Sequence, residues 1–208
     1  MYRPRAYVVD DIPVLHDIIR KRSFAMIATV MDGGVAFAYA PVVLSNDPRP
    51  LGTLRYHLAH ANPLAALHGA KVRVSFLGPD AYVSPDWYGA EGFVPTWNYI
   101  AIEASGGVER LDEVEFRTLL DDLSAQHEAR LLPKTPWTLD KLPGQKIKQL
   151  MNAIVGFRVR LDTLEGKFKL SQDKKPEAFA GVVAVLEKSE DATDRAVADA
   201  MRQHAQKT

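Results

Sequence analysis

Hydrophobic and polar residues alternate in several segments of this chain, and that pattern constrains its fold more than any other feature of the sequence. The alternation runs through three segments: Thr53–Leu58, Lys71–Leu77 and Ile154–Leu164. A repeat of two places the hydrophobic side chains on one face of a β-strand, which can be buried while the other face stays polar. The connections are short and rich in turn residues, so neighbouring strands are expected to run antiparallel.

Further strands are predicted from composition and from turn residues. Phe24–Met31 is expected to form a buried strand, and Asp32-Gly33-Gly34 after it is a hairpin turn signal. Val35–Leu44 should return as a second strand that is interrupted at Pro41. Gly78-Pro79-Asp80 is expected to turn the chain. One more strand is expected from Thr96 to about Val108.

Helices are predicted where capping residues precede hydrophobic residues at helical spacing. Asp10 or Asp11 can cap a first helix, and Asp112 with Glu115 forms a capping box for a helix through roughly Arg130. The other predicted helices are Pro63–His68, Gln145–Ala153, Pro176–Lys188 and Ala192–Gln206. Six or more antiparallel strands with helices at the ends predict a mainly β fold of the α+β class, built as a closed or partly closed barrel.

The charges of the chain cancel, because 26 Lys and Arg residues are matched by 26 Asp and Glu residues. Direct binding of DNA therefore stays open but receives no support from charge. Cysteine is absent, which excludes disulfides and a cysteine nucleophile. The N-terminal residues lack the apolar run of a signal peptide, and no apolar run is long enough to span a membrane. We therefore expect a cytoplasmic protein without a membrane partner.

The stretch Tyr82–Tyr99 is unusually aromatic and contains Trp87 and Trp97, two of the chain's three tryptophans. Its rings are interleaved with small polar residues, among them Ser84 and Asn98. This mixture suits a site for a flat, partly polar ligand, with rings to stack on and polar groups to fix its orientation. An edge strand and loop packed against a barrel or a partner subunit would have a similar composition, and the residues alone leave both interpretations open.

The best candidate for an anion site is the segment from Arg55 to Pro63. Arg55 and His57 should project from the same strand face, and a helix capped by Asn62 would point free N–H groups outward just after His60. A terminal phosphate is the natural occupant of such a site. The alternative is a solvated strand face followed by a capped helix.

A second basic segment is EGKFKLSQ, from Glu165 to Gln172. Lys167 and Lys169 share one side of this segment if it is extended. Two like charges on one face repel unless an anion lies between them, although solvated lysines on an edge strand are an equal alternative.

Several other kinds of site receive no support. The six histidines form no zinc pattern, because no carboxylate stands at ligand spacing from His57 and His60, so no metal site is expected. No GxSxG, Walker A or Rossmann GxGxxG sequence occurs, and no catalytic residue is identified. A helix-turn-helix would need paired short helices with a basic face, and the helical segment 142–153 has no convincing partner.

A set of motifs in a fixed order resembles a known family. The motifs are MYRP at the start, HLAHANP from His57, GPDAYVSPDWY from Gly78, VPTWNY from Val94, IVGF from Ile154 and EGKFKLSQ from Glu165. Together they resemble the PaiB family of FMN-binding negative transcriptional regulators over roughly residues 1–188. The resemblance implies an antiparallel split β-barrel, similar to pyridoxamine phosphate oxidase-like proteins, in residues 1–172, with a C-terminal helical extension in residues 173–208.

The resemblance also implies a homodimer with FMN at the subunit interface, and a family role in repressing protease and sporulation genes. By position, the FMN phosphate would be faced by Arg55, His57, His60 and Asn62. The flavin ring or the dimer seam would lie near Ser84, Trp87, Trp97 and Asn98. Lys167 and Lys169 complete the predicted cofactor-binding residues.

Three alternatives to an FMN-binding regulator follow from the same residues. A flavin-dependent oxidoreductase could use FMN on an unidentified small substrate, because the chemistry belongs to the cofactor. A repressor that reads DNA directly is disfavoured by the zero net charge. A haem-binding barrel would need an axial ligand, for which His57 or His60 is the candidate.

Overall fold

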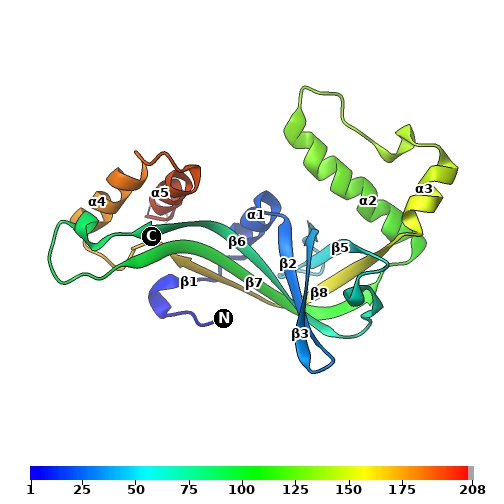
Figure 1. The fold of residues 1–208 in the computed structure, drawn as a ribbon, viewed down its shortest axis with the longest axis horizontal. Coiled ribbons are helices and arrows are strands. Elements are labelled where there is room, and N and C mark those ends of the chain that lie inside the picture. Colours follow the sequence, from blue (N-terminus) through cyan, green and yellow to red (C-terminus); the bar gives the residue numbers. More distant parts are fainter. Residues whose placement is uncertain (206–208) are drawn as a thin grey trace. The chain divides into compact units, whose positions relative to one another are not determined.

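The computed structural model describes residues 1–205, whose strands form one antiparallel sheet (Figure 1). Within these residues eight strands are hydrogen-bonded in the order β3-β2-β6-β7-β8-β5-β4, and β1 pairs with β8. The strands are β1 (Val8–Val9), β2 (Phe24–Met31), β3 (Gly34–Pro41), β4 (Val43–Ser45), β5 (Thr53–Ala59), β6 (Lys71–Val83), β7 (Thr96–Arg110) and β8 (Ile154–Lys169). Among residues 1–205 the sheet is not closed by hydrogen bonds, and its antiparallel strands and helices confirm the predicted fold class.

The helices agree closely with the segments predicted from capping residues. The α-helices are α1 (Ile12–Lys21), α2 (Glu113–Glu128), α3 (Gly144–Met151), α4 (Pro176–Leu186) and α5 (Ala192–Ala205). Short 3-10 helices are η1 (Arg5–Tyr7), η2 (Pro63–Ala66), η3 (Pro85–Tyr88), η4 (Ala129–Leu131) and η5 (Leu139–Lys141). The capping box of Asp112 and Glu115 is present at the start of α2. The predicted end of the last helix, Gln206, lies outside the described residues.

The chain divides into two compact units, which are described separately. The first unit comprises Met1–Asp11, Leu77–Ile102 and Glu165–Thr208, and the second comprises Ile12–Phe76 and Glu103–Leu164. Strands β6, β7 and β8 contribute part of their length to each unit. The division at residue 172 that the sequence predicts stays a prediction.

In the second unit, β2 and β3 form the predicted hairpin. Asp32 and Gly33 both have positive φ angles, 50° and 77°, as a two-residue type I′ turn requires. Only one face of β2 is buried, because Ile27 is fully covered whereas Phe24 and Val30 are 68% and 73% exposed. The prediction of a buried strand was therefore wrong for the face that carries Phe24 and Val30. Hydrophobic composition alone does not show whether one or both faces of a strand are buried.

Buried side chains of the second unit pack on both faces of strands β5 and β8. On the face opposite Arg55 and Arg158, Tyr56 of β5 stacks on Phe157 of β8 with ring centroids 5.4 Å apart. The other face packs against α2. Phe116 and Leu119 of α2 pack against Val43, and a Cβ added at Gly156 would lie 2.5 Å from the Phe116 ring. The sequence therefore has glycine where the helix comes closest to β8.

In the first unit, β6 continues through Gly78, Pro79 and Asp80, so the predicted turn at these residues was wrong. A Cβ added at Gly78 would lie 2.7 Å from Cβ of Ile100, so glycine here permits a close approach to β7. Glycine and proline thus mark a tight contact within a long strand, which local sequence cannot distinguish from a turn.

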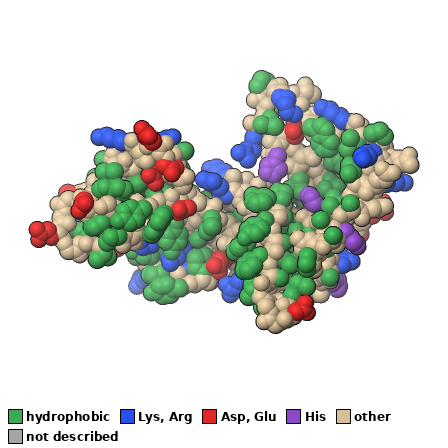
Figure 2. Space-filling model, in the orientation of Figure 1, with side chains coloured by type: hydrophobic (Ala, Val, Ile, Leu, Met, Phe, Trp, Pro, Cys, Tyr) green, Lys and Arg blue, Asp and Glu red, His purple; other side chains and the backbone are tan. Residues whose placement is uncertain are grey.

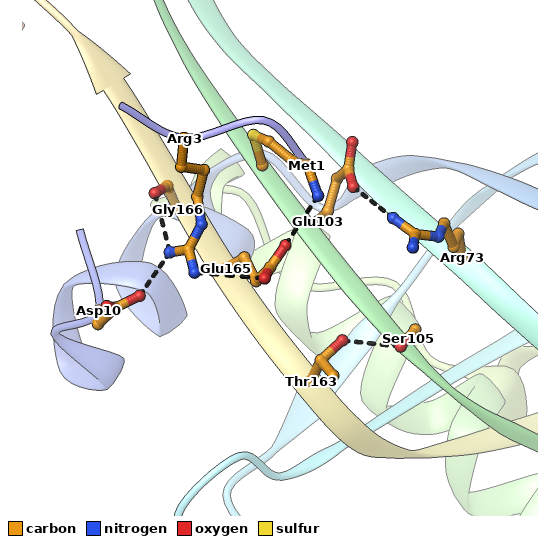
Figure 3. Close-up of polar contacts among 9 residues, drawn as sticks. All are labelled: Met1, Arg3, Asp10, Arg73, Glu103, Ser105, Thr163, Glu165 and Gly166. Atoms are coloured by element: carbon orange, nitrogen blue, oxygen red, sulfur yellow. Dashed lines mark hydrogen bonds and ion pairs between the residues drawn. The ribbon is translucent and has the colours of Figure 1, made fainter. Parts of the chain in front are cut away.

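The N-terminal residues are fastened to β8 by ion pairs within the first unit (Figure 3). The Arg3 guanidinium donates to Glu165 at 3.2 Å and to Asp10, and the terminal amine of Met1 donates to Glu165 at 3.0 Å. Among residues 1–205, no helix has the length and hydropathy needed to cross a membrane.

Candidate functional site

The ten residues predicted to bind a cofactor are divided between the two units. Arg55, His57, His60 and Asn62 belong to the second unit. The first unit holds the others: Ser84, Trp87, Trp97, Asn98, Lys167 and Lys169. Each unit contains a cavity lined by some of these residues together with charged residues that the sequence did not single out.

In the second unit, a cavity of about 670 Å³ lies between α2 and the strands β5 and β8, and we call it the arginine cavity. Its charged lining consists of Asp47, Arg55, Glu115, Asp122, Arg158 and Arg160. Arg55 is directly opposite Arg158 in the ladder between β5 and β8, and Arg160 lies two residues further along β8. Antiparallel pairing thus brings three guanidinium groups to one strand face.

Carboxylates of α2 and β7 offset the repulsion between the opposed arginines. The Arg55 guanidinium donates to Asp122 at 2.6 Å, and Arg158 donates to Glu109 at 2.8 Å and to Glu115. The hydrogen bond to Glu109 and the charges of both glutamates raise the pKa of Arg158. Arg160 is exposed and forms no ion pair within residues 1–205, although its charge, after the hydrogen bond and charge of Arg158, helps to lower the pKa of Glu109. Asp47 also lines the cavity, so the lining carries three guanidinium and three carboxylate groups.

His57 points to the same side of β5 as Arg55 but lines a different cavity. This histidine cavity has a volume of about 230 Å³ and an otherwise largely apolar lining that includes Leu123, Trp137 and Ile147. Nδ1 of His57 is buried and has no hydrogen-bond partner within the described part of the chain. Burial lowers the pKa of His57, which favours the neutral imidazole.

His60 and Asn62 follow at the end of β5. His60 is exposed, and the Oδ1 atom of Asn62 accepts a hydrogen bond from the Leu64 amide at 2.9 Å. The predicted helix is the four-residue 3-10 helix η2, and the Asn62 side chain satisfies one of its amides. Asn62 thus acts as the helix cap that the sequence predicted.

In the first unit, a cavity of about 440 Å³ combines aromatic rings with charged groups, and we call it the lysine pocket. Its lining is Tyr7, Tyr88, Gly92, Phe93, Val94, Thr96, Asn98, Lys169, Ser171, Asp173 and Lys174. Tyr88 and Phe93 pack with ring centroids 4.4 Å apart. Nζ of Lys169 donates to Thr96 Oγ1 and, at 2.7 Å, to the Trp97 carbonyl.

Asn98 is fully buried and hydrogen-bonded within the first unit. Its amide and the Ser171 hydroxyl pair through contacts of 3.0 and 3.1 Å, and Nδ2 also lies 3.4 Å from the sulfur of Met201. Asn98 therefore links β7 to the residues after β8 and to α5, besides lining the lysine pocket.

The remaining predicted residues, Trp87, Trp97, Lys167 and Ser84, lie beside or within groups of aromatic side chains in the first unit. Tyr82 packs edge-to-face against Trp87 and Trp97, with centroids 6.4 and 6.1 Å away. Lys167 lies over the rings of Tyr2 and Tyr99, at 5.5 and 5.3 Å. Ser84 precedes η3 without a side-chain capping bond, although its carbonyl accepts from the Trp87 amide. These residues do not line the lysine pocket.

Sequence reasoning missed residues in the arginine cavity and in the lysine pocket. Arg158 and Arg160 alternate along a predicted strand, but nothing local shows that this strand pairs with the one that carries Arg55. Tyr7, Asp173 and Lys174 of the lysine pocket come from distant segments. The position of Asp173 and Lys174 directly after EGKFKLSQ was the available signal.

An exposed apolar face covers the β2–β3 hairpin, as the hydrophobic side chains in Figure 2 show. Its residues are Phe24, Met26, Ala28 and Val30 on β2, paired in register with Pro41, Tyr39, Phe37 and Val35 on β3. Phe37 and Tyr39 are 52% and 63% exposed. We call these eight residues the apolar strand face.

An open antiparallel sheet with this strand order and flanking helices is that of the split-barrel proteins. The chain belongs to the family whose model is described as "Putative FMN-binding domain", which matches residues 1–163. A relative, "Protease synthase and sporulation protein PAI 2" of Bacillus subtilis, is 27% identical over 209 residues that cover 100% of this chain and 99% of that relative. The resemblance to the PaiB family is thereby confirmed.

Solved structures support the fold. The FAD and heme binding protein from Mycobacterium smegmatis is 20% identical with a TM-score of 0.60, and the match covers 84% of this chain and 79% of that one. The flavocytochrome Anf3 from Azotobacter vinelandii is 14% identical with a TM-score of 0.57, covering 86% of this chain and 78% of that one. At these identities the likeness establishes the fold alone.

Proposed function

We propose that this chain is an FMN-binding flavoprotein of the PaiB type. The observation that carries the proposal is the arginine cavity, all of whose lining residues lie within the match to the FMN-binding family. Its volume of about 670 Å³ is in the range of small-molecule sites. A phosphate ester is the complement of its guanidinium groups, since arginine pairs with phosphate through several hydrogen bonds.

The residues of the arginine cavity fit the phosphate end of FMN. Arg160 forms no ion pair in the described residues, and its exposed guanidinium can pair with a phosphate oxygen. Arg55 can share its fork of donors between Asp122 and the ligand, and the hydroxyl of Thr53 lines the same cavity. When bound, FMN supplies hydride-transfer and one-electron chemistry.

We also propose that the chain forms a homodimer through the apolar strand face. The position of FMN at the subunit interface stays what the family resemblance implies, because no residue of this face lines the arginine cavity. Eight hydrophobic residues in register on two strands make a contiguous surface that water solvates poorly. A second copy would cover it with an identical surface, as a two-fold interface does.

The finer role that we propose is negative regulation of transcription. The support is the likeness over the full chain to PAI 2, whose name refers to protease synthase and sporulation. The balanced charge of 26 basic and 26 acidic residues leaves recognition of DNA to local surfaces or to a partner.

Replacement of Arg55 by alanine tests the assignment of the cavity. FMN binding should weaken about tenfold or more, because a charged hydrogen bond to phosphate is lost. Riboflavin, which lacks the phosphate, should bind the variant and the wild type equally well. Isothermal titration of both flavins measures the difference.

The matched control is Arg117→Ala. Arg117 is an arginine of α2 that pairs with Asp121 and Asp140 and does not line the arginine cavity. Its loss should leave FMN affinity unchanged. Equal losses for FMN and riboflavin in Arg55→Ala would refute the phosphate assignment.

A further inference from the structure

The lysine pocket contains a positive charge, that of Lys169, which forms no ion pair within the described residues. Lys169 is half-buried, and no carboxylate lies within ion-pair distance of its Nζ among residues 1–205. Two of its three hydrogens are donated to neutral oxygens, those of Thr96 and Trp97. A partly desolvated ammonium without a counter-charge is costly, so an anion bound there would be stabilised.

The other charges of the pocket are already paired with each other. Asp173 accepts from Lys174 at 2.8 Å and forms a hydrogen bond with the Tyr7 hydroxyl. These contacts hold the Asp173 carboxylate, and they leave the pocket with one net positive charge, that of Lys169. The ligand is therefore expected to carry a single negative charge.

The apolar part of the lining indicates the rest of the ligand. Tyr88 and Phe93 pack against each other at 4.4 Å, and Val94 continues their surface. Flat rings in van der Waals contact favour another flat, apolar group. The cavity of about 440 Å³ is large enough for a small ring compound.

We propose that the lysine pocket binds a small aromatic carboxylate, whose carboxylate pairs with Lys169 and whose ring lies against Tyr88 and Phe93. The pocket is distinct from the proposed flavin site. Its lining residues all belong to the first unit, and none of them lines the arginine cavity, which belongs to the second unit. The ligand is thus a second small molecule, bound in addition to the flavin.

Titration of the full-length protein with benzoate tests the proposal, with benzamide as the neutral compound of the same shape. Benzoate should bind more tightly than benzamide, because only benzoate carries the charge. In Lys169→Met, benzoate affinity should fall about tenfold or more while benzamide affinity stays the same. The matched control Lys175→Met removes an exposed lysine outside the pocket and should change neither.

A second measurement needs no variant. Burial lowers the pKa of Lys169 below its ordinary value of 10.5; the Asp173 carboxylate opposes this effect, and the charges of Lys174 and Lys167 add to it. Benzoate binding to the wild type should therefore weaken as the pH rises through a value below 10.5, whereas benzamide binding should not.

Three results would overturn the proposal. They are no binding of benzoate, equal binding of benzoate and benzamide at neutral pH, and competitive displacement of benzoate by FMN. Competition would assign the lysine pocket to the flavin and leave the proposal of FMN binding standing. If benzoate binds but FMN does not, only the proposal of FMN binding would be refuted.

Discussion

At the scale of single residues, two groups predicted to bind a cofactor differ in whether their polar atoms have hydrogen-bond partners within the protein. Asn98 is fully buried and hydrogen-bonded to Ser171, and His57 has a buried Nδ1 without a partner. The sequence shows that a residue is polar, but burial is decided by residues far along the chain. The sequence identified Asn98 as a polar residue among aromatic rings, but it could not predict the contact of Asn98 with Ser171.

Ser171→Ala should lower the stability of the protein. The Asn98 amide would lose its hydroxyl partner while remaining buried, which costs about 1–3 kcal/mol. Denaturant unfolding measures the change. Ser105→Ala is the control, because the hydroxyl of Ser105 contacts Thr163 at an exposed position (Figure 3), and it should cost less than about 0.5 kcal/mol. Equal effects of the two substitutions would contradict the role assigned to Ser171.

His57 should make stability depend on pH. Burial lowers its pKa in the folded protein below the ordinary value of 6.5, so the unfolded chain binds more protons between these two values. Stability attributable to His57 is therefore complete above about pH 6.5 and is lost as the pH falls toward the lowered pKa. Relative to His57→Gln, the wild type should lose stability between pH 8 and pH 5.5. A stability difference that stays constant over this range would contradict the buried, neutral imidazole.

At the scale of elements, the sequence predicted most strands and helices because the signals are local. Alternation identified β5, and the capping box identified the start of α2. The turn predicted at Gly78 was wrong because glycine is needed there to avoid a clash with Ile100 on the neighbouring strand. The exposure of one face of β2 could not be predicted either, since a hydrophobic strand has the same sequence whether its cover comes from its own chain or from another.

The apolar strand face can be tested with Phe37→Asp. If two copies pair through it, a buried carboxylate should dissociate the dimer, because a charge cannot be desolvated there without a partner. Light scattering after size exclusion should show a dimeric wild type and a monomeric variant. Leu132→Asp, at a residue that is 64% exposed and outside this face, should stay dimeric. A monomeric wild type would contradict the proposed dimer, and a dimeric Phe37→Asp would contradict the proposed interface.

At the scale of the whole molecule, the family was predictable because its motifs keep their order along the chain. Family membership confirms the PaiB resemblance, and structural likeness confirms the split barrel. The arginine cavity was only half predictable, because Arg55 follows from its strand while Arg158 reaches the same face through a pairing between distant segments. The oxidoreductase and haem-binding alternatives, the homodimer and the cytoplasmic location stay predictions.

The most direct test of the central claim is a titration of FMN and of riboflavin into the flavin-free, full-length protein, followed by flavin fluorescence. The account predicts saturable binding of FMN that is at least about tenfold tighter than that of riboflavin, because the phosphate meets the guanidinium groups of the arginine cavity. Absence of saturable FMN binding, or equal affinity for the two flavins, would contradict it.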